Sequence, residues 1–367
     1  MKGLRLYLPP FAPDDAGAAS VFFPIDGAMV VICDAGGCAG NICGFDEPRW
    51  HLPSLRRAAV FSAGLRDMDA ILGRDEKLIE KMKRAASAIH PRFAALIGTP
   101  VPAVIGTDFR ALTRMAEKRL GLPCIAVPTN GIGLYDKGIG LAYLAMLKRF
   151  ASAEKRPQSG HRILGVFGAS PFDLPILEGR TLRRSLLALG FDTVRLYGID
   201  RSLEDWQNVG ENAENLVIAP SGLAAAKWAQ ERFGTPFTVR FPLLPNEEPA
   251  GGLPLNPKKI LIVDQQFKAN ALRGSIRQML PDTAITCGTF FQQIPDYAEL
   301  QDRTFDSEEA FVAFVAAQQF DLILGDPIFR RALPDYQGAY LDSPHFAVNG
   351  SPARNNERTS KNEGYVL

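Results

Sequence analysis

The fold class is clearest in residues 162–189, which read RILGVFGASPFDLPILEGRTLRRSLLAL. The first six residues of this stretch are mostly apolar and barely alternate with polar ones, which is typical of a strand buried on both faces of a parallel sheet. A turn containing glycine, serine and proline follows, and residues 174–189 then have the apolar spacing of an amphipathic helix. A strand, a turn and a helix in this order predict one βα unit of an α/β protein.

The same order recurs before and after this stretch, which predicts stacked α/β units with mostly parallel sheets. We expect further strands at residues 28–33, 93–97, 124–127, 193–197, 215–218, 258–263, 283–287 and 320–324. We expect further helices at residues 74–90, 108–120, 135–150, 222–233, 267–280 and 307–317. Thr107 is the expected cap of the second of these helices, and Gly121 the residue that ends it. The polar residues 152–161 and the Pro- and Gly-rich residues 246–257 predict linkers between units.

The composition of the 367 residues sets the broad class of protein. Apolar residues make up 46% and charged residues 22%, which excludes a disordered or fibrous chain. Because 41 Lys and Arg face 40 Asp and Glu, the net charge is +1, and no broad basic surface for nucleic acid or anionic lipid is expected. The sequence has no apolar run of about 18 residues and no signal-peptide pattern at its start, so we expect a cytoplasmic protein.

Several common chemical motifs are missing from the sequence. No G-x-G-x-x-G follows an expected strand, and no G-x-x-x-x-G-K-[ST] occurs, so the usual backbone cradles for dinucleotides and nucleoside triphosphates are absent. The sequence also has no G-x-S-x-G and no H-E-x-x-H. We therefore expect that the chain alone binds neither ATP nor a dinucleotide tightly.

The five cysteines are distributed unevenly. Cys33, Cys38 and Cys43 lie in the segment CDAGGCAGNICG, which leaves an expected buried strand and enters a glycine-rich turn. Iron–sulfur clusters need converging thiolates, and glycines such as Gly36 and Gly37 let the backbone approach a cluster closely. A turn of small residues with incidental cysteines is the alternative, and zinc is a rival metal. We interpret Cys38, Cys33 and Cys43, in that order, as metal-ligand candidates, whereas the isolated Cys124 and Cys287 are expected in the core.

Four stretches in matching order make the sequence resemble a known family. Residues 36–38 (GGC) look like a G-x-x-G-C turn, and residues 99–108 (TPVPAVIGTD) are similar to C-P-x-x-x-I-G-D-D. Residues 121–131 (GLPCIAVPTNG) are similar to G-I-P-V-x-x-V-x-T-P-G, and residues 224–236 (AAAKWAQERFGTP) resemble A-x-x-L-x-E-x-F-G-x-P. This ordered set resembles the nitrogenase component 1 superfamily, and more closely its short nitrogenase-like members.

The resemblance implies three Rossmann-like domains, with a cluster or cofactor between them. We expect them at residues 1–151, 162–245 and 258–349, followed by a polar tail at 350–367. It also implies an oxidoreductase subunit that takes low-potential electrons from an ATP-dependent iron–sulfur reductase. The subunit would relay them through an iron–sulfur cluster of the 4Fe–4S type to a bound substrate. A second copy or a related component 1 subunit is the expected structural partner. The alternatives are a non-catalytic scaffold that holds a cluster or cofactor during assembly, and a binding module that lost its cluster.

The sequence departs from the family pattern at one expected ligand. Thr99 stands where the family motif has its cysteine, so Cys33, Cys43 or a partner subunit would have to complete the ligand set. His345 lies near the expected position of a family histidine, but its surroundings match poorly, and no iron–molybdenum cofactor is expected.

Polar residues also follow several expected strands. The loops at residues 170–173 and 264–266, and Asp136 near a helix start, are placed either to face a cleft or to form plain turns. Residues 220–222 have the same ambiguity.

Overall fold

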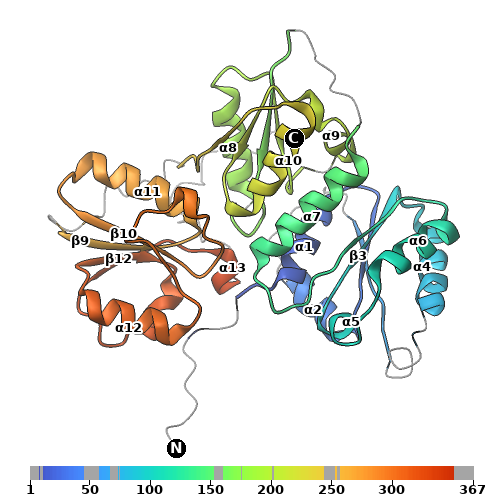
Figure 1. Cartoon of the computed structure of the whole chain (residues 1–367), viewed down its shortest axis with the longest axis horizontal. Helices are drawn as coiled ribbons and strands as arrows, with labels where there is room; N and C mark the ends of the chain where they lie inside the picture. Colours follow the sequence, from blue (N-terminus) through green and yellow to red (C-terminus); the bar gives the residue numbers. More distant parts are fainter. Residues whose placement is uncertain are drawn as a thin grey trace, which may run out of the picture.

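The computed structural model shows three α/β units, each built on its own parallel sheet (Figure 1). It describes residues 8, 11–44, 58–66, 73, 75–152, 160–174, 176–200, 202–243, 253 and 257–350. Most of the two expected linkers, and the expected tail beyond residue 350, lie outside the described residues. Every pairing between the strands is parallel, which confirms the expected fold class. No helix in the described ranges is both long enough and apolar enough to cross a bilayer.

The first sheet has the order β2-β1-β3-β4. Its strands are β1 (Ala28–Ile32), β2 (Ala59–Ser62), β3 (Phe93–Ile97) and β4 (Cys124–Val127). Its helices are α1 (Asp14–Phe22), α2 (Gly37–Gly44), α4 (Asp75–Ile89), α5 (Pro100–Val104), α6 (Phe109–Leu120) and α7 (Tyr135–Phe150). Both faces of the sheet are covered: Met29 and Val31 pack in a cluster with α4 and α6, whereas Val30 and Ile32 pack in a cluster with α1 and α7. This explains why β1 and β3 are apolar at every position.

The cap of α6 differs from the expectation. Asp108, and not Thr107, caps the helix, because its carboxyl group accepts hydrogen bonds from the backbone N–H groups of Arg110 and Ala111. Gly121 ends the helix in the left-handed region (φ 68°), as the sequence predicts.

The second sheet has the order β6-β5-β7-β8. Its strands are β5 (Ile163–Phe167), β6 (Thr193–Leu196), β7 (Glu214–Val217) and β8 (Phe237–Val239). Its helices are α8 (Ile176–Leu187), α9 (Leu203–Gln207) and α10 (Leu223–Phe233), with 3-10 turns η2 (Val209–Glu211) and η3 (Pro220–Gly222).

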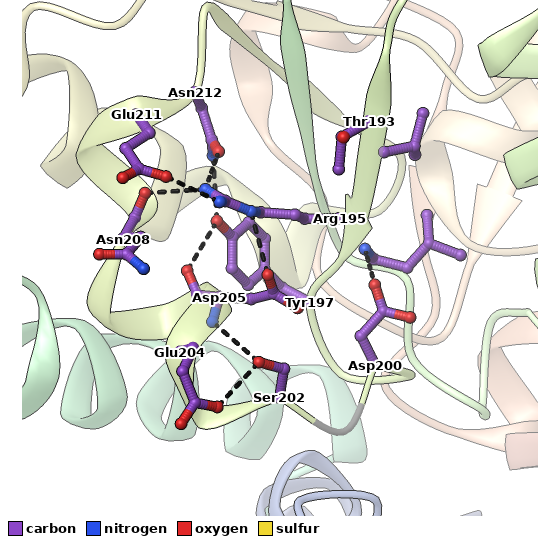
Figure 2. Close-up of polar contacts among 12 residues, drawn as sticks. Thr193, Arg195, Tyr197, Asp200, Ser202, Glu204, Asp205, Asn208, Glu211 and Asn212 are labelled. Atoms are coloured by element: carbon purple, nitrogen blue, oxygen red, sulfur yellow. Dashed lines mark hydrogen bonds and ion pairs between the residues drawn. The ribbon is translucent and has the colours of Figure 1, made fainter. Parts of the chain in front are cut away.

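A buried arginine fixes the α9–η2 segment beside this sheet (Figure 2). Arg195 on β6 forms ion pairs with Asp205 (3.0 Å) and Glu211 (2.9 Å), and it donates to the carbonyl oxygen of Asn208 (2.8 Å). A guanidinium group with two carboxyl partners can be buried because its charge stays paired. The arrangement therefore has a structural role, and its residues are separate from the candidate sites.

The third sheet has the order β11-β10-β9-β12-β13. Its strands are β9 (Lys259–Val263), β10 (Ala284–Thr289), β11 (Arg303–Thr304), β12 (Leu322–Gly325) and β13 (Ala339–Asp342). Its helices are α11 (Gln266–Met279), α12 (Glu308–Gln318) and α13 (Phe346–Asn349), with turns η4 (Pro295–Tyr297) and η5 (Pro327–Ala332). In Figure 1, α11 and α12 lie on opposite faces of this sheet.

Helix α1 lies at the centre of the molecule, alongside α7 (Figure 1). All nine of its residues are buried. Two glycines make this close packing possible: a Cβ atom on Gly138 would lie 1.8 Å from the carbonyl oxygen of Asp14, and one on Gly17 would lie 2.0 Å from that of Tyr135. The core cluster that contains α1 and α7 continues into the second and third units, so the three units share one hydrophobic core.

Candidate functional site

The first candidate site is the turn that follows β1. Asp34 organises it, because its carboxyl group accepts hydrogen bonds from the Ala39 backbone N–H (2.7 Å) and from the Ser62 hydroxyl (2.6 Å). The first of these bonds satisfies a free N–H in the first turn of α2. Gly36 has a φ of 119°, a conformation that glycine adopts readily. Strand β1 therefore leads through this turn into helix α2.

Cys33 lies on the core side of this turn. Its side chain is 2% exposed and packs in the cluster beneath α4 and α6, and its thiol donates to the carbonyl oxygen of Val31. Burial raises the pKa of Cys33 to about 12, with the carboxyl groups of Asp34 and Asp75 adding to the effect. A thiol in this environment stays protonated at neutral pH.

Cys38 lies in the first turn of α2 and is partly exposed. The Thr99 hydroxyl lies within hydrogen-bonding reach of its sulfur. Partial burial, followed by the negative charges of Asp34 and Asp15, raises the pKa of Cys38. Binding a metal at this sulfur would therefore release a proton, because only the thiolate is a good ligand.

Cys43 lies in the last turn of α2 and is also partly exposed. Cys43 lies five positions after Cys38 in the helix, so the two side chains project about 140° apart around the helix axis. Within the described ranges, no three His, Cys, Asp or Glu side chains are placed to hold a metal ion together. Cys38 thus fits as one ligand of a metal group, but the described residues of a single chain do not complete a ligand set.

The glycines on either side of Cys38 are exposed. Among the described residues, nothing beyond the neighbouring backbone lies within 4 Å of a Cβ atom placed on Gly37 or Gly40. Thr99 precedes α5, whose Val104 is 85% exposed, and Pro100 of that helix packs against the loop that carries Ile132, 83% exposed. We call the surface formed by Gly36, Gly37, Cys38 and Gly40 the cysteine face. Exposed large apolar side chains such as Val104 and Ile132 are typical of a surface that contacts another molecule.

The second candidate site is the junction where the three units meet. Ser170 and Asp173 follow β5 in the second unit, and Asp264 follows β9 in the third. Tyr135 begins α7 in the first unit, and His345 precedes α13 in the third. Ligands of parallel α/β sheets bind outside the carboxyl ends of the strands, so this is the expected place for a site between units.

Hydrogen bonds connect these side chains into one network. The Tyr135 hydroxyl donates to Asp173 Oδ1 (2.6 Å), and the Ser170 hydroxyl donates to Asp173 Oδ2 (2.8 Å). His345 Nε2 lies 3.4 Å from the Tyr135 oxygen, 3.6 Å from Asp173 Oδ1 and 3.8 Å from Asp264 Oδ1. The residues of this network come from all three units.

Burial determines the electrostatics of the junction. Burial, then the charge of Asp173, raises the pKa of Tyr135 well above its usual value, so its hydroxyl stays a proton donor. Burial also raises the pKa of Asp136 to about 6, against the opposing effect of the Gln292 backbone N–H, which donates to its carboxyl group at 2.6 Å. A cation, Lys268, lies beside Asp264, with its Nζ 3.4 Å from Asp264 Oδ2.

The structure resolves several of the ambiguities left by the sequence. The loops at 170–173 and 264–266, Asp136 and His345 all lie at the junction, and the Gln265 side chain donates to the carbonyl oxygen of Ile218 across units. Ser221 is also buried and has no hydrogen-bond partner for its hydroxyl among the described residues. Tyr135 adjoins Asp136, but sequence reasoning missed Asp326 as a junction residue. Its signal is positional, because it directly follows strand β12.

The two isolated cysteines lie where the sequence predicts. Cys124 and Cys287 are 2% and 4% exposed, and both pack among apolar side chains of β-strands. Burial raises the pKa of Cys124 to about 12. Neither thiol belongs to the cysteine face or to the junction.

Comparisons with known proteins agree with this architecture. The family model described as nitrogenase component 1 type oxidoreductase matches residues 14–246. Two curated relatives are named nitrogenase iron-molybdenum cofactor biosynthesis protein NifE. That of Clostridium pasteurianum is 26% identical over 223 residues, covering 60% of this chain and 48% of the relative. That of Klebsiella pneumoniae is 25% identical over 236 residues, covering 60% of this chain and 50% of the relative. The chain therefore spans about half the length of these relatives.

Solved structures share the fold over most of the chain. A structure titled "Nitrogenase Cp1 at pH 6.5" aligns with a TM-score of 0.71 at 13% identity, covering 94% of this chain and 87% of that one. A second, titled "Nitrogenase Cp1 at pH 5", aligns with a TM-score of 0.67 at 13% identity and covers 93% of this chain and 84% of that one. The likeness therefore extends beyond residue 246 to the third unit.

Proposed function

The chain belongs to the nitrogenase component 1 type oxidoreductase family, and from this premise we propose that it is one chain of a two-chain scaffold that holds an iron–sulfur cluster or cofactor precursor. The partner chain is a second copy or a related component 1 subunit. Cys38 supplies one ligand from this chain, and the partner chain supplies ligands that this chain lacks.

One observation carries the proposal: Cys38 is a partly exposed thiol between exposed glycines, with no complete ligand set around it among the described residues. A surface site with an incomplete set of ligands is completed most simply by a second protein that docks over it. The names of the curated relatives favour a role in cofactor assembly over a role in substrate turnover.

The second candidate is the catalytic role, which the family's description as an oxidoreductase favours. In that role the chain would accept electrons one at a time from an ATP-dependent iron–sulfur reductase and pass them through the cluster to a bound substrate. The two roles predict different results in a turnover assay. A scaffold binds the cluster and transfers it to an acceptor protein, whereas a reductase subunit consumes reductant in the presence of the ATP-dependent partner.

The test compares two cysteine variants with matched chemistry. Protein purified without oxygen is reconstituted with ferrous iron and sulfide, and iron content, visible absorbance and sedimentation are measured for Cys38→Ala and Cys124→Ala. We expect Cys38→Ala to lose most of the iron and the cluster absorbance, and Cys124→Ala to keep both, because its sulfur packs in the core. Full iron content in Cys38→Ala, or a wild-type chain that stays monomeric when loaded, would contradict the proposal.

A further inference from the structure

We infer that the junction of the three units is closed by this chain's own side chains and holds no resident group, so that the proposed metal group is carried at the cysteine face alone. The family resemblance implies a cluster or cofactor between the units. The residues at the junction do not fit one, for three reasons that concern space, hydrogen bonding and ligand chemistry.

The space between the units is filled by aromatic rings. The Tyr135 ring lies 5.2 Å from that of Phe172 and 4.9 Å from that of Phe291, measured between centroids. The His345 ring stacks on Phe291 at 5.2 Å, and Phe172 contacts Phe346 at 5.7 Å. These are ordinary contact distances for packed aromatic pairs, and each of the three units contributes at least one ring. A group placed between the units would have to displace these rings from one another.

The polar groups at the junction are matched to one another. Asp173 accepts from the hydroxyl groups of Tyr135 and Ser170. The other carboxyl groups of the junction also have partners: Ser343 and Lys268 for Asp264, the His345 N–H and Asn349 for Asp326, and the Gln292 N–H for Asp136. A ligand would have to break several of these buried bonds, and each broken one leaves a polar group without a partner.

Two buried atoms near the junction are unmatched within the described residues, namely Ser221 Oγ and His345 Nδ1. His345 Nδ1 is buried and has no hydrogen-bond partner there, although Nε2 faces Tyr135 and Asp173. A single lone pair or N–H is satisfied by one buried water, which occupies far less room than a metal group. His345 Nδ1 is the atom at which a ligand would attach, and the experiment below therefore includes a His345 variant.

The ligand chemistry at the junction is also wrong for a soft metal cluster. Iron–sulfur groups are held mainly by thiolates. Cys287, the cysteine of the third unit, packs under α11 with Ile260 and Ile262, and its N–H is bonded to Asp302. Its thiol therefore does not reach the junction. Within the described ranges, His345 and the carboxyl groups beside it do not form a group placed to hold a metal ion.

The inference rests on the proposed function and deepens it, because it restricts the metal group to the cysteine face. The following experiment distinguishes failure of the inference from failure of the proposed function. Full-length protein is reconstituted with ferrous iron and sulfide, and iron per chain is measured for His345→Gln, Asp173→Asn and Cys38→Ala. We expect the two junction variants to keep wild-type iron content to within about 20%, while Cys38→Ala loses most of it. Loss of half or more of the iron in either junction variant, with native sedimentation, overturns the inference but leaves cluster binding intact.

A second readout needs no variants. Amide hydrogen exchange of the metal-free protein reports whether the junction is closed: we expect residues 135–139 and 170–174 to exchange as slowly as the strands β1 and β5. Fast exchange there in the metal-free protein, followed by protection after iron loading, refutes closure. If wild-type protein takes up no iron, the proposed function fails, and slow exchange at the junction still supports the inference.

Discussion

Replacing Tyr135 with phenylalanine removes a single oxygen atom from the junction. The ring keeps its contacts with Phe172 and Phe291, so the hydrophobic burial and the packing change little. The change therefore isolates the hydrogen bond of 2.6 Å that the hydroxyl donates to Asp173. Asp173 keeps the Ser170 hydroxyl at 2.8 Å, and its Oδ1 keeps His345 Nε2 at 3.6 Å, which is beyond normal hydrogen-bonding distance.

The magnitude follows from the burial of both partners. A hydrogen bond to a charged group contributes about 1.5–3 kcal/mol to the stability of the folded state. When a buried acceptor is left without its donor, most of this stabilisation is lost. We therefore expect the free energy of unfolding to fall by about 2 kcal/mol in Tyr135→Phe. Because the bond joins the first unit to the second, the loss should appear in the transition that separates the units.

The assay is urea unfolding followed by tryptophan fluorescence and circular dichroism, with Tyr336→Phe as the matched control. The Tyr336 hydroxyl donates to the Ala339 carbonyl oxygen at 3.1 Å near the surface, so its loss should cost less than about 0.5 kcal/mol. If Tyr135→Phe is no less stable than Tyr336→Phe, the junction network does not hold the units together and the reasoning is wrong.

Three further predictions concern other parts of the fold. Gly138→Ala should destabilise the protein by at least about 3 kcal/mol in the same unfolding assay, because its Cβ would lie 1.8 Å from the backbone oxygen of Asp14. A stability close to that of the wild type would contradict the packing of α1 on α7. The pKa of Asp136 is raised by burial to about 6, so the folded state binds more protons than the unfolded state between about pH 4 and 6. Stability should therefore fall as the pH rises through this range, by up to about 3 kcal/mol from this residue, and Asp136→Asn should flatten the curve measured by unfolding at each pH. Arg195→Met should cost about 2–3 kcal/mol because it leaves two partly buried carboxyl groups without their cation. Arg92→Met, which breaks an exposed ion pair, should cost less than about 1 kcal/mol, and equal losses in thermal unfolding would refute this.

The sequence predicts the parallel sheets well because their signal is local. Apolar runs such as residues 93–97 and 163–167 are strands, and the amphipathic segment that forms α4 has a polar face that marks it as a helix on the surface. The sequence does not predict helix α1. Its nine residues are buried on every side, so no change from apolar to polar residues marks a face, and the segment has none of the usual helix periodicity.

The two candidate sites differ in the same way: one is formed by a local segment, and the other by segments far apart in the chain. The cysteine turn is contiguous in sequence, so the glycine-rich turn after a buried strand is within reach of sequence reasoning. The burial of Cys33 is not, because it depends on whether the residue after β1 faces α4 or solvent. The junction network joins Tyr135, Asp173 and His345 from three units, and no local pattern reports contacts between segments so far apart in the chain.

The central position of α1 also sets an order of events during synthesis. Helix α1 leaves the ribosome before β1, yet its main packing partner α7 is made only after all four strands of the first sheet. Domains generally fold from the N-terminus as the chain grows, but this helix lacks that partner until residue 150 has emerged. During that interval a segment that is wholly buried in the folded protein is exposed to other chains and to chaperones. The first unit is therefore expected to complete its folding late, and fragments that stop before α7 should be captured or aggregate rather than fold.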